Sequence, residues 1–447
     1  MGLRAQYTLA FHSMVTLQKN GDDLLLAGHG GNAMHLAEPG NALNTLLANL
    51  VTGGMTADQL CEAPAEQEDG VKVARLYYAI AAFEKKGFLT YTLAVGEKKW
   101  ATLEVVSPAF CMQQALSNVQ YRLSRFACLR RLDHAILLES PLGHARVFLH
   151  DSRAAAALAL LAMPHTAAEL AAEWPGMDIL DLTSLLSLLL SAGAAFVCDT
   201  RGCIAEDESV PLQQWEFHDL LFHHRSRTVR HADTAGGTYR FLGTLPSLPA
   251  LKLPMSDQCI ALALPDMVAL AAGDVPFSRV SESRQSIRIR GEQPITLGQL
   301  AEFLYRTARV KRIEPADAAR GAFYESSWRV CPSGGAMHEL ELYLSISRCD
   351  GLAPGLYRYD PLGHALDHLS DLGAAQQTVI AAGSGAAGLT HPPDVLITLA
   401  ARFQRVSWKY QSCLFVDSEK CGRAFAADVL GSNCHGFSAL CVRRRRF

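Results

Sequence analysis

The N-terminal half of the chain carries two segments in which strand-like and helix-like apolar patterns follow in the same order. In each segment, two short apolar runs precede an apolar helix, a short capped helix and a longer helix, and a further apolar run closes the segment. In the first segment, the runs that predict these elements are 23–27, 33–36, 42–50, 56–60, 71–86 and 88–93. In the second segment they are 135–139, 145–149, 154–163, 166–170, 180–191 and 195–197.

This order of elements predicts two winged-helix-like modules, one over 1–110 and a second over 111–205. Neither has a basic face, and stacking aromatic residues are few, which argues against DNA binding. Two interpretations stay open. The modules are either structural additions or peptide-docking modules whose exposed strand edge accepts a leader peptide by strand addition.

A different pattern follows, and it predicts a third domain over 206–447. Apolar residues at helical spacing predict a helix within 215–227 and another after Thr296, a residue suited to capping a helix. Two later runs, 340–346 and 355–360, predict a pair of strands. Helices and strands that do not alternate regularly indicate an α+β fold.

Composition narrows the class of protein. A chain of 447 residues is too long for one ordinary core, and 49% hydrophobic residues with 19% charged residues indicate a globular protein. A net charge of −3 gives no general attraction for nucleic acid or membrane. The 12 cysteines form no CxxC pair, so we expect reduced thiols, a cytoplasmic location and no metal site. The longest apolar run, 180–197, carries several polar residues, and no membrane span is expected.

One short segment is the first candidate for chemistry: Pro332-Ser333-Gly334-Gly335-Ala336, directly before an apolar run. Glycines lack a Cβ atom, so their backbone N–H groups can approach a flat ligand closely. By itself the segment fits a plain tight turn better than a binding site.

A second candidate lies upstream, in Arg284-Gln285-Ser286-Ile287-Arg288. Two guanidinium groups and a hydroxyl in this spacing suit a phosphate, which they bind through charge-assisted hydrogen bonds. A solvated basic turn is the simpler interpretation of such a segment when nothing else accompanies it.

Several segments together resemble the nitroreductase-like FMN oxidoreductases, and among them the SagB-type dehydrogenases of azole-containing peptide biosynthesis. The resemblance covers about 215–410, and longer family members also carry tandem N-terminal modules. The segments are WEFHDLLFHHRSR from Trp215, SRQSIR from Ser283, ITLGQLAEFLYRTARV from Ile295, RVCPSGGAMHELELYL from Arg329, GLAPGLYRYDP from Gly351 and WKY from Trp408.

The resemblance implies an FMN cofactor and a homodimer with the flavin at its interface. It assigns the phosphate and ribityl chain to Arg284, Gln285, Ser286 and Arg288. It assigns the isoalloxazine ring to Pro332, Ser333, Gly334 and Gly335, from the other protomer. Family enzymes oxidise thiazolines or oxazolines in a precursor peptide to thiazoles or oxazoles, alongside a cyclodehydratase complex, and molecular oxygen reoxidises the flavin.

Lys409 and Tyr410 match the catalytic Lys-Tyr pair of that family. The reaction needs a base at the α-carbon of the ring. A lysine can act as that base only if burial lowers its pKa from about 10.4 towards neutrality. Tyr410 could instead relay the proton or orient the ring. The division of these roles stays open.

After Tyr410 the resemblance ends, and the chain closes on a run of arginines at 443–446. When permitted codons for the segment from Cys421 are read one base later, they give VGALLQQMYLVATAMGLAPCALGGG, an amphipathic helix and a glycine-rich loop of the family type. We therefore hypothesise that the reading frame shifts shortly after Tyr410, at about residue 411, which would impair FMN binding and dimerisation. Sequencing of the source gene decides this.

Two other functions compete with azoline oxidation. The first is an NAD(P)H-dependent nitroreductase that acts on small molecules, against which the N-terminal modules and the Lys-Tyr pair argue. The second is a non-catalytic scaffold that binds peptide and has a disabled flavin site.

Overall fold

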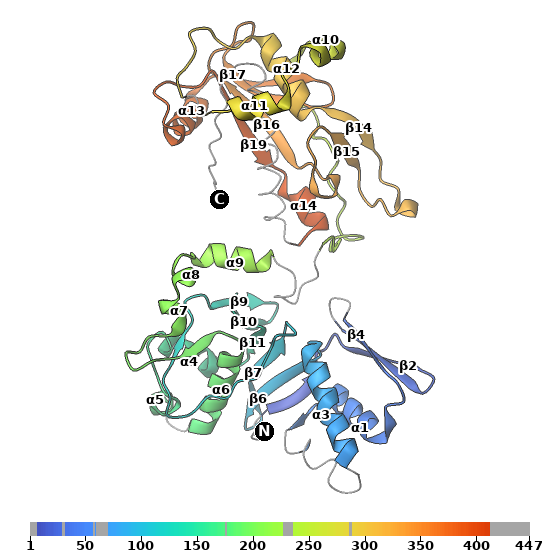
Figure 1. Cartoon of the computed structure of the whole chain (residues 1–447), viewed down its shortest axis with the longest axis vertical. Helices are drawn as coiled ribbons and strands as arrows, with labels where there is room; N and C mark the ends of the chain where they lie inside the picture. Colours follow the sequence, from blue (N-terminus) through green and yellow to red (C-terminus); the bar gives the residue numbers. More distant parts are fainter. Residues whose placement is uncertain are drawn as a thin grey trace. The chain divides into compact units, whose positions relative to one another are not determined.

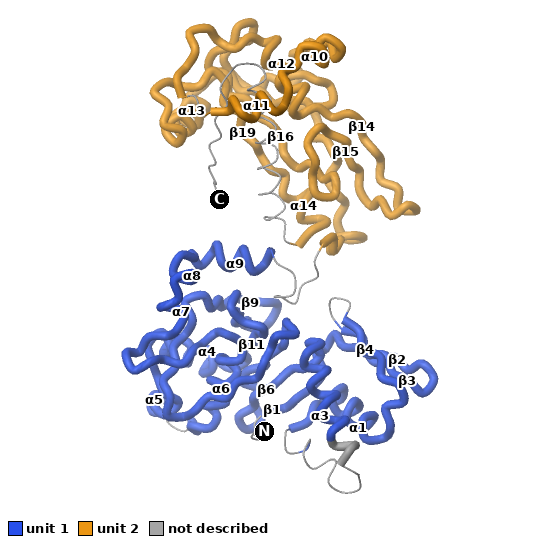
Figure 2. The backbone as a smooth tube through the Cα atoms, in the orientation of Figure 1, with its two compact units in different colours: residues 1–235 blue, residues 236–447 orange. Residues whose placement is uncertain are grey.

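The structure is a computed structural model that describes residues 7–28, 32–56, 59, 70–174, 177–226, 236–285 and 288–411. The chain divides into two compact units, unit 1 over Met1–Ala235 and unit 2 over Gly236–Phe447 (Figure 2). Among the described residues, no helix combines the length and apolar character needed to cross a membrane.

Unit 1 contains strands and helices in both of the predicted segments (Figure 1). The first segment forms β1 (Tyr7–Phe11), β2 (Thr16–Asn20), β3 (Asp23–Ala27), β4 (Ala33–Leu36), α1 (Gly40–Thr52), β5 (Met55–Thr56), α3 (Gly70–Lys85), β6 (Leu89–Val95) and β7 (Lys98–Val105). The second forms β8 (Tyr121–Leu123), β9 (Cys128–Leu132), β10 (Ala135–Glu139), β11 (Ala145–Leu149), α4 (Ser152–Leu160), α5 (Ala167–Glu173), α6 (Ile179–Ser191) and β12 (Ala195–Val197). Three short helices follow: α7 (Ala205–Glu208), α8 (Val210–Gln213) and α9 (Phe217–Arg225).

A single antiparallel sheet runs through both segments of unit 1, in the order β5-β1-β6-β7-β11-β10-β9. The segments join where β7 pairs with β11, from Ala101 opposite Leu149 to Val105 opposite Ala145. One continuous apolar core lies under this sheet, and α6 contributes a row of buried leucines to it. In the described residues the element order agrees with the sequence pattern, except that Thr56 ends β5, and most of the short helix predicted over 56–60 lies outside the described residues. The assignment to winged-helix modules and the division at residues 110 and 205 stay predictions.

The short helix α5 shows why the sequence starts a helix where it does. The Thr166 side chain accepts a hydrogen bond from the Glu169 backbone N–H, and the Glu169 carboxylate accepts one from the Thr166 N–H. Such reciprocal bonds satisfy two donors that a helix start leaves free. The same pair of bonds joins Thr56 and Gln59, at the equivalent place in the first segment.

Unit 2 is built on an antiparallel sheet of order β13-β18-β17-β16-β19 with α12 packed on it. Its elements are β13 (Cys259–Ala261), α10 (Met267–Gly273), α11 (Phe277–Ser283), α12 (Leu297–Ala308), β14 (Val310–Glu314), the 3₁₀ turn Ala318–Arg320, β15 (Ser326–Arg329), the 3₁₀ turn Gly334–Ala336, β16 (Leu340–Ile346), β17 (Gly355–Asp360), β18 (Ala365–Asp371), α13 (Ala374–Ala387), β19 (Val395–Ala401) and α14 (Phe403–Lys409). Thr296 caps α12 through a capping box with Gln299, as the sequence predicts.

The pairing register of β16 and β19 determines where the candidate site lies. In the antiparallel pair β16 and β19, Leu340 at the start of one strand lies opposite Ala401 at the end of the other. The glycine-rich turn precedes β16, and α14 follows β19 (Figure 1). Segments about seventy residues apart in sequence therefore meet at one end of the sheet. Both of the predicted motifs at 332–336 and 408–410 lie there.

Candidate active site

The glycine-rich turn has a fixed backbone shape. Ser333 Oγ accepts a hydrogen bond of 3.0 Å from the backbone N–H of His338, which closes the turn. Gly335 has a φ of +61°, in the left-handed region that favours glycine. Pro332 and Gly335 are exposed, so the turn presents backbone to the outside of the unit.

Arg405 holds this turn from α14. Its guanidinium is fully buried and donates to three backbone carbonyls, those of Leu248, Glu325 and Met337. Burial, together with the nearby cations Arg402 and Arg329, lowers the pKa of Arg405 to about 10. A buried guanidinium with five donors is well suited to join several carbonyls at once.

Lys409 lies against the turn through a chain of hydrogen bonds. Its Nζ donates to Tyr324 Oη at 2.7 Å, and the Tyr324 hydroxyl donates to the Gly335 carbonyl oxygen at 2.6 Å. A Cβ atom built on Gly335 would lie 2.6 Å from Lys409 Nζ and 2.6 Å from Tyr410 Oη. The glycine therefore leaves the space that both side chains occupy.

Aromatic rings surround the Lys409 ammonium. Its Nζ lies 4.9 Å from the ring centroid of Tyr324, 5.2 Å from that of Tyr410 and 5.5 Å from that of Tyr239. Trp408 is buried and packs edge-on against the rings of Tyr239 and Tyr324. Ring faces attract a cation, so the arrangement favours the charged form of the lysine.

A short segment from the beginning of unit 2 supports the pair from the other side. Thr238 and Tyr239 both donate their backbone N–H groups to the Lys409 carbonyl, at 2.9 and 3.1 Å. Gly237 and Tyr410 form an isolated antiparallel bridge. Within the described residues, the buried hydroxyl of Thr238 has no hydrogen-bond partner, which leaves one polar group at this site free for a ligand or water.

The surroundings of Lys409 oppose the effect of burial on its pKa. Burial lowers the pKa of Lys409, but the hydrogen bond to Tyr324 and the electrostatic effect of the three surrounding tyrosines outweigh burial, so the pKa of Lys409 is raised. The condition under which a lysine could act as the base, a pKa that burial lowers towards neutrality, is therefore not met in this arrangement. The opposing acceptor, Tyr324, lies 85 residues away in sequence.

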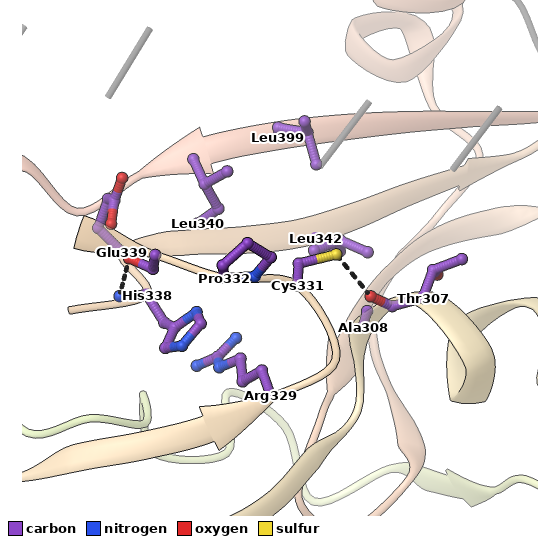
Figure 3. A pocket seen from close by; sticks show the side chains of 11 residues that line it. Thr307, Ala308, Arg329, Cys331, Pro332, His338, Glu339, Leu340, Leu342 and Leu399 are labelled. Atoms are coloured by element: carbon purple, nitrogen blue, oxygen red, sulfur yellow. Dashed lines mark hydrogen bonds between the residues drawn. The ribbon is translucent and has the colours of Figure 1, made fainter. Parts of the chain in front are cut away.

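A small cavity adjoins the same turn (Figure 3). Its volume is about 60 Å³, the space of about two water molecules. Pro332 and Ser333 line it, together with the side chain of Arg329, whose pKa burial lowers. The cavity is too small for the tricyclic ring of a flavin.

The candidate phosphate segment lies at the end of α11, in another part of unit 2. Arg284 and Gln285 are exposed, and Arg288 Nε donates to the Ala387 carbonyl at 3.2 Å. In the described part of the chain, neither Arg284 nor Arg288 forms an ion pair with a carboxylate. Ser286 lies outside the described residues, as does the segment after 411 to which the frameshift hypothesis refers. The structure brings Gly335, Lys409 and Tyr410 together, and it joins the arginine segment to none of them within one chain.

Tyr324, Arg405 and Tyr239 were not identified from the sequence. Each contacts the Lys-Tyr pair or the glycine turn from a distant position in the chain. No local spacing separates them from other half-buried tyrosines and arginines.

Comparison with known proteins shows a match to one family over part of the chain and similarity to a protein of known name. Residues 121–232 match the family described as cyanobactin oxidase ThcOx. A protein of Methanocaldococcus jannaschii that is named as a nitroreductase is 28% identical over 149 residues, which are 33% of this chain. This chain spans 66% of that relative, slightly less than two thirds.

Two solved structures were also compared. A protein of Ralstonia eutropha described as a nitroreductase is 23% identical, with a TM-score of 0.31 over 44% of this chain and 80% of its own. The Escherichia coli microcin synthetase McbBCD complex, with truncated pro-MccB17 bound, is 16% identical, with a TM-score of 0.26 over 39% of this chain and 70% of the matched one. These scores are too low to support an argument. The family match and the relative, taken with the motifs around Pro332 and Lys409, support the resemblance to nitroreductase-like proteins of the SagB type.

Proposed function

We propose that this protein oxidises thiazoline or oxazoline rings of a ribosomally made precursor peptide to thiazoles or oxazoles, with FMN as its cofactor. The observation that carries the proposal is the meeting of Lys409 and Tyr410 with Gly335 of the glycine-rich turn. The resemblance assigns the first two to the substrate ring and the third to the flavin, so their contact is the arrangement that such a reaction needs.

The residues present fit an FMN. Arg284 and Arg288 have no carboxylate partner among the described residues, so both guanidinium groups are available to a phosphate. Pro332 and Gly335 expose backbone on which a flat ring can lie. When bound, FMN would accept the hydride that leaves the β-carbon of the azoline, while the α-carbon loses a proton.

The Lys-Tyr pair would take part in the removal of that proton. A lysine held in its charged form by Tyr324 is better suited to orient the ring as a cation than to accept its proton. We therefore propose that Lys409 orients the azoline and that Tyr410, whose hydroxyl also adjoins Gly335, relays the α-proton to water by giving up its own hydroxyl proton as it takes the proton from the ring.

A homodimer fits the exposed surface of unit 2. Large apolar side chains are exposed along α10, α11 and the adjoining segments, among them Leu264, Val268, Phe277 and Ile289, with exposed fractions from 69% to 85%. An apolar surface of this kind commonly marks a protein interface. It adjoins Arg284 in sequence, which supports a flavin site completed by the glycine-rich turn of a second copy.

Peptide binding is proposed for unit 1. Strand β2 is an edge strand of the three-stranded sheet β2-β3-β4, and four of its five residues are exposed. Such an edge can accept an extended leader peptide by strand addition. A cyclodehydratase complex that supplies the azolines would be the protein partner. The match of 121–232 to a family described as a cyanobactin oxidase supports a peptide substrate.

A synthetic peptide with one thiazoline tests the proposal. Mass spectrometry should show the loss of two hydrogen atoms from the peptide in air, and a matched peptide with unmodified cysteine should not change. A protein that leaves the thiazoline intact, but oxidises NADPH in the presence of a nitroaromatic compound, would instead support the nitroreductase alternative, which the name of the archaeal relative favours.

A further inference from the structure

Tyr324 lies directly between Lys409 and the glycine-rich turn. It precedes β15, which pairs with β14, and its hydroxyl contacts two other segments of unit 2. Tyr324 Oη accepts from Lys409 Nζ at 2.7 Å and donates to the Gly335 carbonyl at 2.6 Å. The resemblance assigns no role to this residue.

We propose that Tyr324 is a positioning residue that fixes the Lys409 ammonium beside Gly335 and Tyr410. A role for Tyr324 in catalysis rests on the proposed function. Its effect on the position and charge of Lys409 does not, because that effect concerns only side chains of this chain. It adds a second tyrosine hydroxyl, with a defined task, to the Lys-Tyr pair.

The donors and acceptors around the Tyr324 hydroxyl allow it only one orientation. A protonated lysine has donors and no acceptor, and a tyrosine hydroxyl has one hydrogen. The Gly335 carbonyl accepts that hydrogen, so a lone pair of Tyr324 Oη faces Lys409 Nζ. Each bond polarises the next one, and the chain therefore favours the charged lysine.

Among the residues that the structure describes, no other group accepts a hydrogen bond from Lys409 Nζ in place of Tyr324. Tyr239 and Tyr410 face the ammonium with their rings, at 5.5 and 5.2 Å from the ring centroids, and Trp408 has no acceptor. Tyr324, Tyr239 and Tyr410 are the titratable groups that act on the Lys409 charge. When the Tyr324 hydroxyl is removed, burial of Lys409 has fewer opposing contacts, and the pKa of Lys409 should fall.

The ring and the hydroxyl of Tyr324 make different contacts. It packs against Trp408 with centroids 6.1 Å apart and against Tyr239 at 6.5 Å. Tyr324→Phe keeps those ring contacts and removes only the hydroxyl. Tyr239→Phe is the matched control, because it removes a hydroxyl from a ring that also faces Lys409 but makes no hydrogen bond to Nζ among the described residues.

The direct measurement is an NMR titration of the purified full chain labelled with ¹³Cε-lysine, with the Lys409 signal assigned from Lys409→Arg. We expect Lys409 in the wild type to titrate above the ordinary value for a lysine side chain, about 10.4. In Tyr324→Phe its midpoint should fall by at least about half a pH unit, which is about a threefold change in the ionisation constant, and in Tyr239→Phe it should change less. A midpoint that is the same in Tyr324→Phe and in the wild type overturns the proposal. So does a wild-type midpoint below that ordinary value, and this second readout holds even if the Phe variant does not fold.

Turnover of the thiazoline peptide separates this inference from the proposed function. Tyr324→Phe should lower kcat about tenfold and leave KM nearly unchanged, as for a group that acts only in the reaction step. If the wild type does not oxidise the peptide while the NMR shift occurs, the proposed function fails and the positioning role stands. If the wild type is active and Tyr324→Phe matches it in kcat and in the titration, the positioning role fails alone.

Discussion

Arg405 and Lys409 lie four residues apart on α14 and extend from the same side of that helix. Arg405 binds the carbonyl of Met337 at the end of the glycine-rich turn, and Lys409 reaches the carbonyl of Gly335 in the same turn through Tyr324. One short helix therefore both anchors the turn and supplies its candidate chemistry, which explains how two distant motifs keep a fixed geometry.

Loss of the Arg405 guanidinium should destabilise unit 2. Arg405→Met leaves the buried carbonyls of Leu248, Glu325 and Met337 without their donors, and we expect the free energy of unfolding to fall by about 3 kcal/mol. Thermal unfolding followed by circular dichroism measures the change. Gln404→Ala, an exposed neighbour on the same helix, is the control and should unfold at the wild-type temperature. Equal melting temperatures for both variants would contradict the anchoring role.

A methyl group at Gly335 should displace the Lys-Tyr pair. Gly335→Ala places a Cβ 2.6 Å from both Lys409 Nζ and Tyr410 Oη, at a φ of +61° that alanine rarely adopts. Both atoms are the ends of side chains that can move, so we expect a folded protein with peptide oxidation at least about tenfold slower. Gly385→Ala, where a Cβ meets no atom within 4 Å, should remain fully active. Wild-type turnover in Gly335→Ala would show that close contact at this glycine is unimportant.

Removal of the pair itself should abolish chemistry while the cofactor stays bound. Lys409→Met and Tyr410→Phe should each lower the rate of thiazoline oxidation by about a hundredfold or more, because the first removes the group that orients the ring and the second removes the group that relays the proton. Flavin content, read from the visible spectrum, should be unchanged. Lys311→Met, on the exposed face of β14, serves as the control for loss of a lysine. Retained turnover in both variants of the pair would exclude it from catalysis.

Substitutions of the arginines in the segment 284–288 should weaken FMN binding. Arg284→Ala and Arg288→Ala should each raise the Kd for FMN about tenfold, because each removes one charge-assisted contact to a phosphate. Fluorescence quenching of added FMN measures this. Arg279→Ala, an exposed arginine on α11, should bind FMN as the wild type does. If all three variants bind equally, the phosphate lies elsewhere.

Acid should weaken unit 1 through Glu104. Its carboxylate is desolvated, which by itself raises its pKa, but His12 and Arg146 together lower the pKa below the ordinary value. A carboxylate with a depressed folded-state pKa contributes stability above its unfolded pKa of about 4.5 and loses that contribution as pH falls through the folded value. Glu104→Gln should therefore have a free energy of unfolding about 2 kcal/mol lower than that of the wild type at pH 7, and this gap should narrow as the pH falls below about 4.5. A gap that does not depend on pH would contradict this role.

Much of the local structure follows from sequence patterns. Thr166 with Glu169 and Thr296 with Gln299 mark helix starts that the structure confirms, because capping depends on residues only three positions apart. The strands at 340–346 and 355–360 are confirmed as well, because apolar residues of a sheet repeat over a short window.

Long-range relationships could not be predicted in the same way. The pairing of β7 with β11 merges the two N-terminal segments into one sheet, and no local pattern encodes which strand edges meet. The Tyr324 hydroxyl and Lys409 are 85 residues apart, and their contact depends on how β15, the turn and α14 pack. The sequence therefore indicated the Lys-Tyr pair and the turn separately, but it could not show the contact that raises the pKa of Lys409.

The most direct test of the azoline oxidation proposed here is an anaerobic titration of the flavin-loaded protein, expressed from a gene of verified reading frame, with a thiazoline peptide. We expect the visible flavin absorbance to bleach in proportion to the thiazole formed, and to return when air is admitted. A flavin that NADPH bleaches while the thiazoline peptide leaves it unchanged, or a protein that takes up no flavin, would contradict that proposal.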